Sequence, residues 1–355
     1  AISALRHTIA VAGTHGKTTT SSMLALVLRE AGLRPSFIIG GDVNEIGTGA
    51  AWDGGDLLVV EADESDGSFL ELSTRFGLVT NLEPDHLEHH GGFDPLLDAF
   101  DRFVDAVDGP VVVGVDDVEG AALAARHGTA TVGTSAGSDW RLSGVVESWE
   151  GVKFTLTGPV TGAFGLELPV PGLHNARNAA SAASLAVLAG ATPEAVVSAL
   201  ARFGGVARRF EHRGQAAGVV LVDDYAHLPT EVGAVLATAR SGGFSRVVAV
   251  FQPHRFSRTE ALWSSFGGAF DDADVLYVTD VYPSGEPPRP GVSGQLVADA
   301  VIRDRPGADV RYVARREELL DALVGELREG DLCLTMGAGD LTAVPDQLRT
   351  RLGAS

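Results

Sequence analysis

Short apolar runs alternate with longer amphipathic stretches between Thr8 and Val132. The apolar runs predict buried strands of a largely parallel sheet, because strands covered on both faces are nearly continuous in hydrophobic residues. The stretches between them have the spacing of helices, so this part of the chain predicts an α/β fold. The predicted strands are Thr8–Ala12, Ser36–Ile39, Leu57–Glu61, Gly77–Asn81 and Pro110–Val115, and the predicted helices are Thr18–Ala31, Asp94–Val107 and Val118–Arg126.

Closely spaced strand candidates replace this pattern between residues 140 and 170. The turn formers Glu150-Gly151 and Gly158-Pro159 join them, which predicts a small antiparallel sheet. Two helices follow, and the second has Thr192 as its N-cap and Pro193 at its first position. The strands are Arg141–Ser148, Val152–Thr157 and Ala163–Pro169, and the helices are Asn175–Ala189 and Pro193–Ala201.

The pair Gly204-Gly205 ends this pattern, and a second alternating series begins at Val219. We therefore expect two α/β domains. Residues 1–205 form a central domain with a mostly parallel sheet plus the small antiparallel sheet, and residues 206–355 form a Rossmann-like, doubly wound domain. The strands of the second domain are Val219–Val222, Val247–Phe251, Val275–Thr279, Val310–Val313 and Leu332–Met336, and its helices are Pro229–Ala239, Arg258–Phe270, Gly294–Ile302 and Arg316–Leu327.

Composition narrows the class of protein. The 355 residues are enough for two cores, and 45% hydrophobic with 21% charged residues is ordinary for a globular protein. No apolar run approaches the roughly 20 residues of a membrane span. The formal charge of −20 disfavours a nucleic acid partner. The single cysteine, Cys333, excludes an intramolecular disulfide and a thiolate zinc site, and it suits a reducing cytoplasm.

A glycine-rich turn at Gly13–Thr20 follows the first predicted strand and leads into the first predicted helix. This order predicts a phosphate-binding loop, because glycines let backbone N–H groups converge on an oxyanion at a helix N-terminus. Lys17 is placed to reach β- and γ-phosphates and Thr18 to hold Mg²⁺. The full P-loop pattern has glycine where this chain has Val11, and a Gly-Lys-Thr triplet also arises by chance. The flanking strand and helix favour the functional interpretation.

Carboxylates and histidines follow two further predicted strands. Glu61 is the first of four acidic residues at a strand end, where P-loop enzymes place a Mg²⁺ ligand. For Asp63, Glu64 and Asp66, an acidic solvated turn is an equally good explanation. The next strand leads to Asp85 and His86, and this imidazole can bind a second divalent ion with Asp85 orienting it. Zinc is the weaker alternative, because oxygen ligands dominate. His89 and His90 are expected to be loop residues.

Amides and arginines supply further candidates. Asn175 and Asn178 share one face of a predicted helix start, and amides can read an adenine edge, although N-capping explains one of them. The pair Arg208-Arg209 can reach a nucleotide phosphate or can be a plain surface pair. In the second domain Asp223–His227 and Gln252–Arg258 each follow a strand. Arg255 and Arg258 form a fork suited to a small carboxylate, and Gly337–Asp340 lies at the same predicted rim.

The ordered motifs together resemble the Mur ligases of peptidoglycan synthesis, over essentially the whole chain. Within this family the chain is most similar to the members that add L-alanine. The motifs are AGTHGKTTT from Ala12, EADESD from Glu61, NLEPDH from Asn81, HNARN from His174, GGVARRF from Gly204, DDYAH from Asp223, QPHRFSR from Gln252 and GAGD from Gly337.

The resemblance implies an ATP-dependent ligase that uses Mg²⁺ and joins L-alanine to the carboxylate of UDP-N-acetylmuramate through an acyl phosphate. It implies catalytic roles for Lys17, Glu61, His86 and Arg255, with Thr18, Glu61 and His86 as metal ligands. It assigns ATP binding to Gly13, Thr14, His15, Gly16, Lys17, Thr18, Thr19, Asn175, Asn178, Arg209 and Asp223. It assigns substrate binding to Tyr225, His227, His254, Arg255 and Arg258.

Several alternatives stay open. The chain can prefer another amino acid or the murein tripeptide, or it can be a nucleotide-binding regulatory module without ligase chemistry. His86, His227 or bulk solvent can accept the proton of the attacking amine. The family usually has a second histidine where this chain has Leu228. Family members also carry an amino-terminal UDP-binding domain that has no counterpart here, so we expect this chain by itself to be weakly active.

Overall fold

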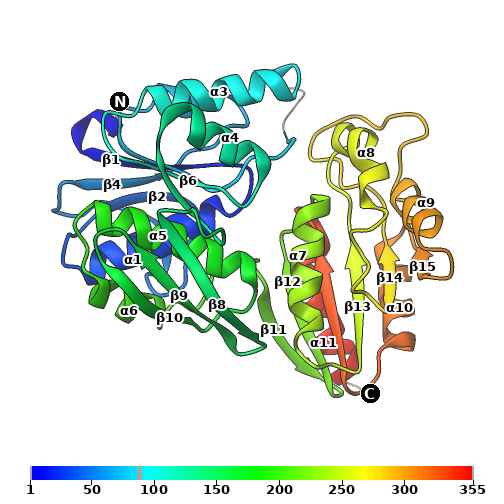
Figure 1. Cartoon of the computed structure of the whole chain (residues 1–355). Helices are drawn as coiled ribbons and strands as arrows, with labels where there is room; N and C mark the ends of the chain where they lie inside the picture. The colour runs from blue at the N-terminus through cyan, green and yellow to red at the C-terminus, as the bar shows by residue number, and fades with distance from the viewer. Residues whose placement is uncertain (1, 86–89, 354–355) are drawn as a thin grey trace. The chain divides into compact units, whose positions relative to one another are not determined.

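The computed structural model describes residues 2–85 and 90–353. It divides into two compact units, residues 1–207 and 208–355, so the division falls close to the boundary expected after Gly205. Figure 1 labels the elements of both units.

One mixed sheet crosses the described part of unit 1, in the strand order β10-β9-β8-β7-β6-β5-β1-β4-β2-β3. Strand β1 lies inside it, parallel to β4 on one side and to β5 on the other. The carboxyl ends of these three strands therefore meet at one edge. The strands are β1 (His7–Ala12), β2 (Ser36–Val43), β3 (Thr48–Ala51), β4 (Leu57–Glu61), β5 (Thr74–Val79), β6 (Val111–Gly114), β7 (Ala130–Gly133), β8 (Trp140–Ser148), β9 (Gly151–Gly158) and β10 (Gly162–Leu168).

The α/β prediction for this unit is confirmed, with one correction to its arrangement. The antiparallel strands β8, β9 and β10 form as predicted, but they do not make a separate sheet, because β8 pairs with β7 and continues the large one. Strand β7, which makes this connection, was not predicted from the sequence. Nor was β3, whose four residues are small and partly exposed and so lack the apolar signal of a buried strand.

Helices cover both faces of this sheet (Figure 1). On one face lie α1 (Lys17–Glu30), α5 (Leu173–Leu188) and α6 (Pro193–Leu200), and on the other lie α3 (Phe93–Asp105) and α4 (Val118–His127). Every residue of α1 from Thr19 to Leu28 is buried. This burial explains its weak amphipathic pattern, since α1 packs against both the sheet and the neighbouring helices.

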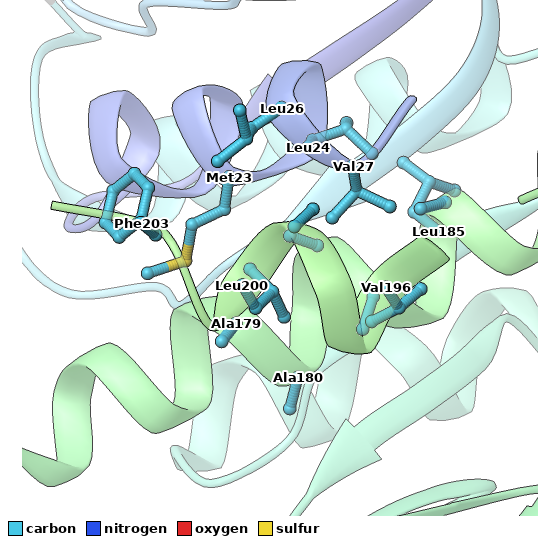
Figure 2. Close-up of a cluster of buried hydrophobic side chains, with 14 of the residues drawn as sticks. Met23, Leu24, Leu26, Val27, Ala179, Ala180, Leu185, Val196, Leu200 and Phe203 are labelled. Carbon is cyan, nitrogen blue, oxygen red and sulfur yellow. The ribbon is translucent and has the colours of Figure 1, made fainter. Parts of the chain in front are cut away.

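Small side chains on α5 let α1 and α6 approach it closely. Six alanines of α5 are buried, and Thr192 caps α6 as predicted by accepting a hydrogen bond from the Ala195 amide at 3.3 Å. Figure 2 shows the resulting cluster, in which the chain after α6 adds one aromatic ring. Its labelled members are Met23, Leu24, Leu26, Val27, Ala179, Ala180, Leu185, Val196, Leu200 and Phe203.

Truncating that ring measures how much this cluster stabilises unit 1. Phe203→Ala should lower the free energy of unfolding by about 3–5 kcal/mol, because Phe203 is fully buried and its loss leaves a cavity. Chemical denaturation followed by circular dichroism checks this. The matched control Val197→Ala, at an exposed position of α6, should change stability by no more than about 0.5 kcal/mol. Equal effects of the two variants would contradict the assigned packing.

Unit 2 is a doubly wound α/β sheet in the order β11-β12-β16-β13-β14-β15. All pairs are parallel except β11 with β12. The strands are β11 (Glu211–Ala216), β12 (Val219–Asp224), β13 (Arg246–Phe251), β14 (Val275–Val278), β15 (Asp309–Tyr312) and β16 (Asp331–Met336). The helices are α7 (Pro229–Arg240), α8 (Phe256–Leu262), α9 (Gln295–Asp304), α10 (Arg316–Glu326) and α11 (Val344–Gly353).

The Rossmann-like prediction for this unit is confirmed, and three details differ. Strand β11 was missed because it is a polar edge strand with no fully buried residue. Helix α11, which packs with α10 on one face of the sheet, was also missed. The helix expected over 258–270 is shorter and continues as a 3₁₀ turn at Trp263–Phe266. Among the described residues, no helix has the length and apolarity needed to cross a membrane.

Candidate functional site

The loop between β1 and α1 requires glycine at two positions. Gly13 has φ +123° and Gly16 has φ +77°, which side chains rarely adopt. A Cβ on Gly13 would lie 2.2 Å from Thr80 Oγ1, and one on Gly16 would lie 2.4 Å from Asn178 Oδ1. Helix α1 begins at Lys17, directly after the second glycine. The loop is therefore a tight turn with glycine at both ends that leads into a helix N-terminus, the geometry that accepts phosphate.

The segment after β5 fixes the shape of this loop. Thr14 N donates to the Asn81 carbonyl at 3.0 Å, and His15 N donates to Asn81 Oδ1 at 2.9 Å. Thr80 Oγ1 donates to the His15 carbonyl at 2.7 Å. The ring of His15 also lies 3.2 Å from Glu83 Oε2. The segment after β5 thus holds the loop from one side through both backbone and side-chain hydrogen bonds.

Thr18 and Glu61 form an oxygen pair beside the loop. Thr18 Oγ1 donates to Glu61 Oε1 at 2.9 Å, and Gly40 N donates to Glu61 Oε2 at 2.7 Å. A hydroxyl in the first turn of α1 and a carboxylate at the end of β4 match the oxygen ligands that Mg²⁺ takes in phosphate-loop proteins. These two predicted metal ligands therefore lie together and fit the ion. The third, His86, lies outside the described residues.

The ammonium of Lys17 points into the loop and meets a carboxylate that the sequence analysis did not single out. Lys17 Nζ donates to the carbonyls of Gly13 at 2.7 Å and Thr14 at 3.2 Å, and it lies 2.8 and 3.0 Å from the two Glu64 oxygens. The side chain of Glu64 is only 1% exposed. Burial raises its pKa, and Lys17 opposes that rise. Asp63 beside it is exposed, so the acidic run is not one uniform solvated turn.

The two asparagines of α5 lie at different places. Asn178 is nearly buried with its side chain against Gly16 of the loop. Asn175 donates from Nδ2 to the Pro171 carbonyl at 2.7 Å and so secures the first turn of its helix. Arg177 between them pairs with Asp116 at 2.7 Å. Both predicted adenine contacts remain predictions, and only Asn178 directly adjoins the loop.

Asp85 and His90 are the described residues next to the segment that contains His86. Asp85 is 7% exposed, and the His90 ring donates from Nε2 to the Glu64 carbonyl at 2.8 Å, so His90 supports the carboxylate that holds Lys17. Outside residues 1, 86–89 and 354–355, no group of three or more histidine, cysteine or acidic side chains is arranged to hold a metal ion.

The Lys17–Glu64 ion pair should contribute strongly to the free energy of unfolding. Lys17→Met should lower the free energy of unfolding by about 3–5 kcal/mol, because it leaves a buried carboxylate without its cation. The double variant Lys17→Met/Glu64→Gln should recover most of this loss, because no charge is then left uncompensated. Urea titration of both variants measures the effect. A single variant as stable as the unaltered chain would show that the two groups are not coupled.

The predicted substrate residues of unit 2 meet at the carboxyl ends of β12 and β13. The Tyr225 and His227 rings lie 5.5 Å apart, His227 and His254 lie 5.8 Å apart, and Tyr282 stacks on His254 at 5.8 Å. Tyr282 was missed, because nothing in its local sequence marks it as part of a rim. His227 Nδ1 lies 3.0 Å from the Tyr225 carbonyl. A carbonyl only accepts, so Nδ1 carries the proton and Nε2 the lone pair of the neutral ring.

Arginines surround this ring series. Arg258 is 9% exposed, and its guanidinium lies 3.1 Å from His254 Nδ1. Burial, with the nearby His227, Arg258 and Arg255, lowers the pKa of His254 to about 3. His254 is therefore neutral near pH 7 and accepts from Arg258. Arg255 has φ +67°, and its N–H donates to the Tyr282 carbonyl at 2.8 Å. A non-glycine residue with this strained backbone conformation is typical of functional sites.

Arg208 and Arg209 both lie over the Tyr225 ring, at 4.8 and 5.1 Å from its centroid. Arg208 also donates to the carbonyls of Gly337 at 2.7 Å and Gly339 at 3.3 Å, so it joins the glycine-rich loop after β16 to this rim. Arg209, the residue predicted to approach the nucleotide, contacts the same ring, and its charge opposes the rise in the pKa of Asp224. Leu228, which replaces the second histidine of the family motif, is buried.

Asp223 and Asp224, at the end of β12, accept hydrogen bonds from threonine hydroxyls and from backbone amides. Asp223 accepts from the hydroxyls of Thr335 and Thr342, each at 2.6 Å, and its side chain is 1% exposed. Burial raises the pKa of Asp224 to about 6, and its carboxylate accepts from the amides of Phe210 and Ala226. These contacts give Asp223 a structural role, and its predicted contact with the nucleotide stays a prediction.

Unit 1 thus has the architecture of a P-loop unit, the class that binds nucleoside triphosphates, and unit 2 is a doubly wound sheet with a cationic, aromatic rim. Residues 11–186 match the Mur ligase middle domain, and residues 208–339 match the Mur ligase glutamate ligase domain. The chain belongs to the Mur ligase family.

Individual relatives agree with this assignment. The chain is 48% identical to a UDP-N-acetylmuramate–L-alanine ligase of Kineococcus radiotolerans, over 97% of this chain and 74% of the relative. It is 41% identical to the protein of the same name from Thermobifida fusca, over 97% of this chain and 75% of that one. The crystal structure of the UDP-N-acetylmuramate-alanine ligase MurC from Thermotoga maritima has a TM-score of 0.82 and 29% identity, over 98% of this chain and 76% of that chain.

Proposed function

We propose that this chain is the ATP-using part of a ligase that joins L-alanine to the carboxylate of UDP-N-acetylmuramate in peptidoglycan precursor synthesis. The observation that carries the proposal is that this chain, which has a phosphate loop, has relatives that share the name UDP-N-acetylmuramate–L-alanine ligase. These relatives are 40–48% identical to it over 95–99% of the chain. The relatives favour the alanine-adding ligase over the tripeptide ligase and over a regulatory module. The reaction belongs to the cytoplasm, where ATP is supplied.

The first half-reaction needs an electrophile that a carboxylate does not provide. ATP converts the muramate carboxylate into an acyl phosphate, with ADP as the leaving group. The first-turn amides of α1 and the Lys17 ammonium bind the triphosphate and offset its charge. Thr18 and Glu61 are the described residues that would hold Mg²⁺. When bound, the ion neutralises charge on the transferring phosphoryl group.

The second half-reaction joins the amine to the activated carboxyl carbon. The amine of alanine attacks the acyl phosphate, and phosphate leaves from the tetrahedral intermediate. Arg255 and Arg258 are suited to the alanine carboxylate, since guanidinium groups bind carboxylates through two parallel hydrogen bonds. His227 is a candidate base, because its Nδ1 proton is held by a carbonyl and Nε2 carries the lone pair. Neutral His254 keeps Arg258 in place without adding a charge.

Removal of the loop cation tests the nucleotide part of the proposal. Lys17→Ala should reduce alanine-dependent phosphate release by about 100- to 1,000-fold or more, because the transferring phosphoryl group loses a preorganised positive charge. The assay contains ATP, Mg²⁺, UDP-N-acetylmuramate and L-alanine. Lys153→Ala is the matched control, because Lys153 is an exposed lysine of the same unit. Near-normal release by the Lys17 variant would refute the assignment of the loop.

Removal of one arginine tests the amino acid site separately. Arg255→Ala should raise the KM for L-alanine by about ten- to a hundredfold, because a charge-assisted contact to the carboxylate is lost. The KM for ATP should change little. Arg315→Ala provides the control, since that side chain is 71% exposed and pairs with Glu318 in the first turn of α10. An unchanged KM for alanine in the Arg255 variant would show that this guanidinium serves another purpose.

A further inference from the structure

Glu64 is a buried charged group that the proposed chemistry does not use. It lies in the turn after β4, three residues beyond Glu61, and its side chain is 1% exposed. Both of its oxygens contact the Lys17 ammonium, at 2.8 and 3.0 Å. Its backbone carbonyl accepts from the His90 ring, so the turn that carries it is itself held in place.

These contacts saturate the ammonium. An ammonium group has three protons, and Lys17 Nζ has four oxygen atoms within 3.2 Å, two from Glu64 and one each from Gly13 and Thr14. A phosphate that engages this ammonium must therefore displace one of these oxygens. The two loop carbonyls are neutral, whereas the Glu64 carboxylate carries the same sign of charge as the phosphate.

We propose that Glu64 is a positioning residue that holds the Lys17 ammonium in the loop until phosphate takes it, and that competes with the β- and γ-phosphates of the nucleotide. The inference rests on the proposed function in one respect, that the loop binds ATP. It adds a consequence for affinity: Glu64 keeps the cation oriented at the expense of weaker nucleotide binding. Weaker binding applies to ADP as well as to ATP, so it also favours product release.

The direction in which nucleotide affinity changes when Glu64 is altered distinguishes competition with phosphate from ordinary structural support. A residue that merely braces the loop would weaken nucleotide binding when it is altered. A competing anion would strengthen binding when its charge is removed, because like charges close together in a partly buried site repel strongly. Glu64→Gln keeps the size and hydrogen-bonding capacity of the side chain and removes only the charge.

Titration calorimetry of Mg²⁺-ADP into the whole chain tests the proposal, with the unaltered protein, Glu64→Gln, Glu64→Asp and Asp63→Asn compared at one salt concentration. Glu64→Gln should lower the Kd at least about threefold, since one repulsive charge is gone. Glu64→Asp should lower it by a smaller factor, because the shorter carboxylate lies farther from the ammonium. Asp63→Asn removes a neighbouring exposed charge that accepts from Ser65, and it should leave the Kd unchanged.

The outcomes separate the two claims. Binding of ADP by the unaltered chain, with Kd unchanged or raised in Glu64→Gln, overturns the competition and leaves the nucleotide site standing. If Glu64→Gln does not fold, Glu64→Asp decides, and an unchanged or raised Kd there overturns the inference as well. Equal tightening in Asp63→Asn would show a general charge effect and would also overturn it. Absence of ADP binding by the unaltered, folded chain contradicts the proposed function and the inference together.

Discussion

The loop between β1 and α1 depends on one steric constraint, the lack of room for a side chain at Gly13 and Gly16. Thr80 closes the first position and Asn178 the second. The same two contacts tie the loop to β5 and to α5, so the phosphate-binding turn is also a packing junction of unit 1. A substitution at either glycine would disturb these neighbouring segments as well as the backbone of the loop.

Charge in this region is organised around Lys17. The chain as a whole is strongly acidic, so a phosphate must be held by a few placed cations and by Mg²⁺. Lys17 is held by two loop carbonyls and by Glu64, while Glu61 is held apart from it by Thr18 and the Gly40 amide. Two carboxylates of one acidic run thus have different partners, one suited to a metal ion and the other to the lysine.

The sequence predicted most of the architecture, because the strands that matter most are continuous in apolar residues. Strand β4 was placed at Leu57–Glu61, as the structure has it, and the boundaries of α1 and α5 were within a few residues. The strands that were missed were β3 and β7, which have four residues each, and β11, which is polar and lies at the edge of its sheet. Their formation is decided by pairing with a neighbouring strand, which periodicity along the chain does not report.

The candidate site was predicted less completely than the fold. Motifs identified Lys17, Thr18 and Glu61, because strand ends at one sheet edge must meet. They did not identify Glu64 or Tyr282, since an acidic run resembles a solvated turn and a lone tyrosine carries no signal. Which member of an acidic run is buried depends on the path of the turn after the strand, and only the folded chain reveals it.

In the proposed function, the turn around Lys17 binds the phosphates of ATP. Amide hydrogen exchange, measured by mass spectrometry with and without Mg²⁺-ADP, tests it most directly. Peptides containing residues 13–20 and the bracing segment 80–83 should gain the strongest protection in unit 1. Unchanged exchange in both segments, at a nucleotide concentration that saturates the chain, would contradict it.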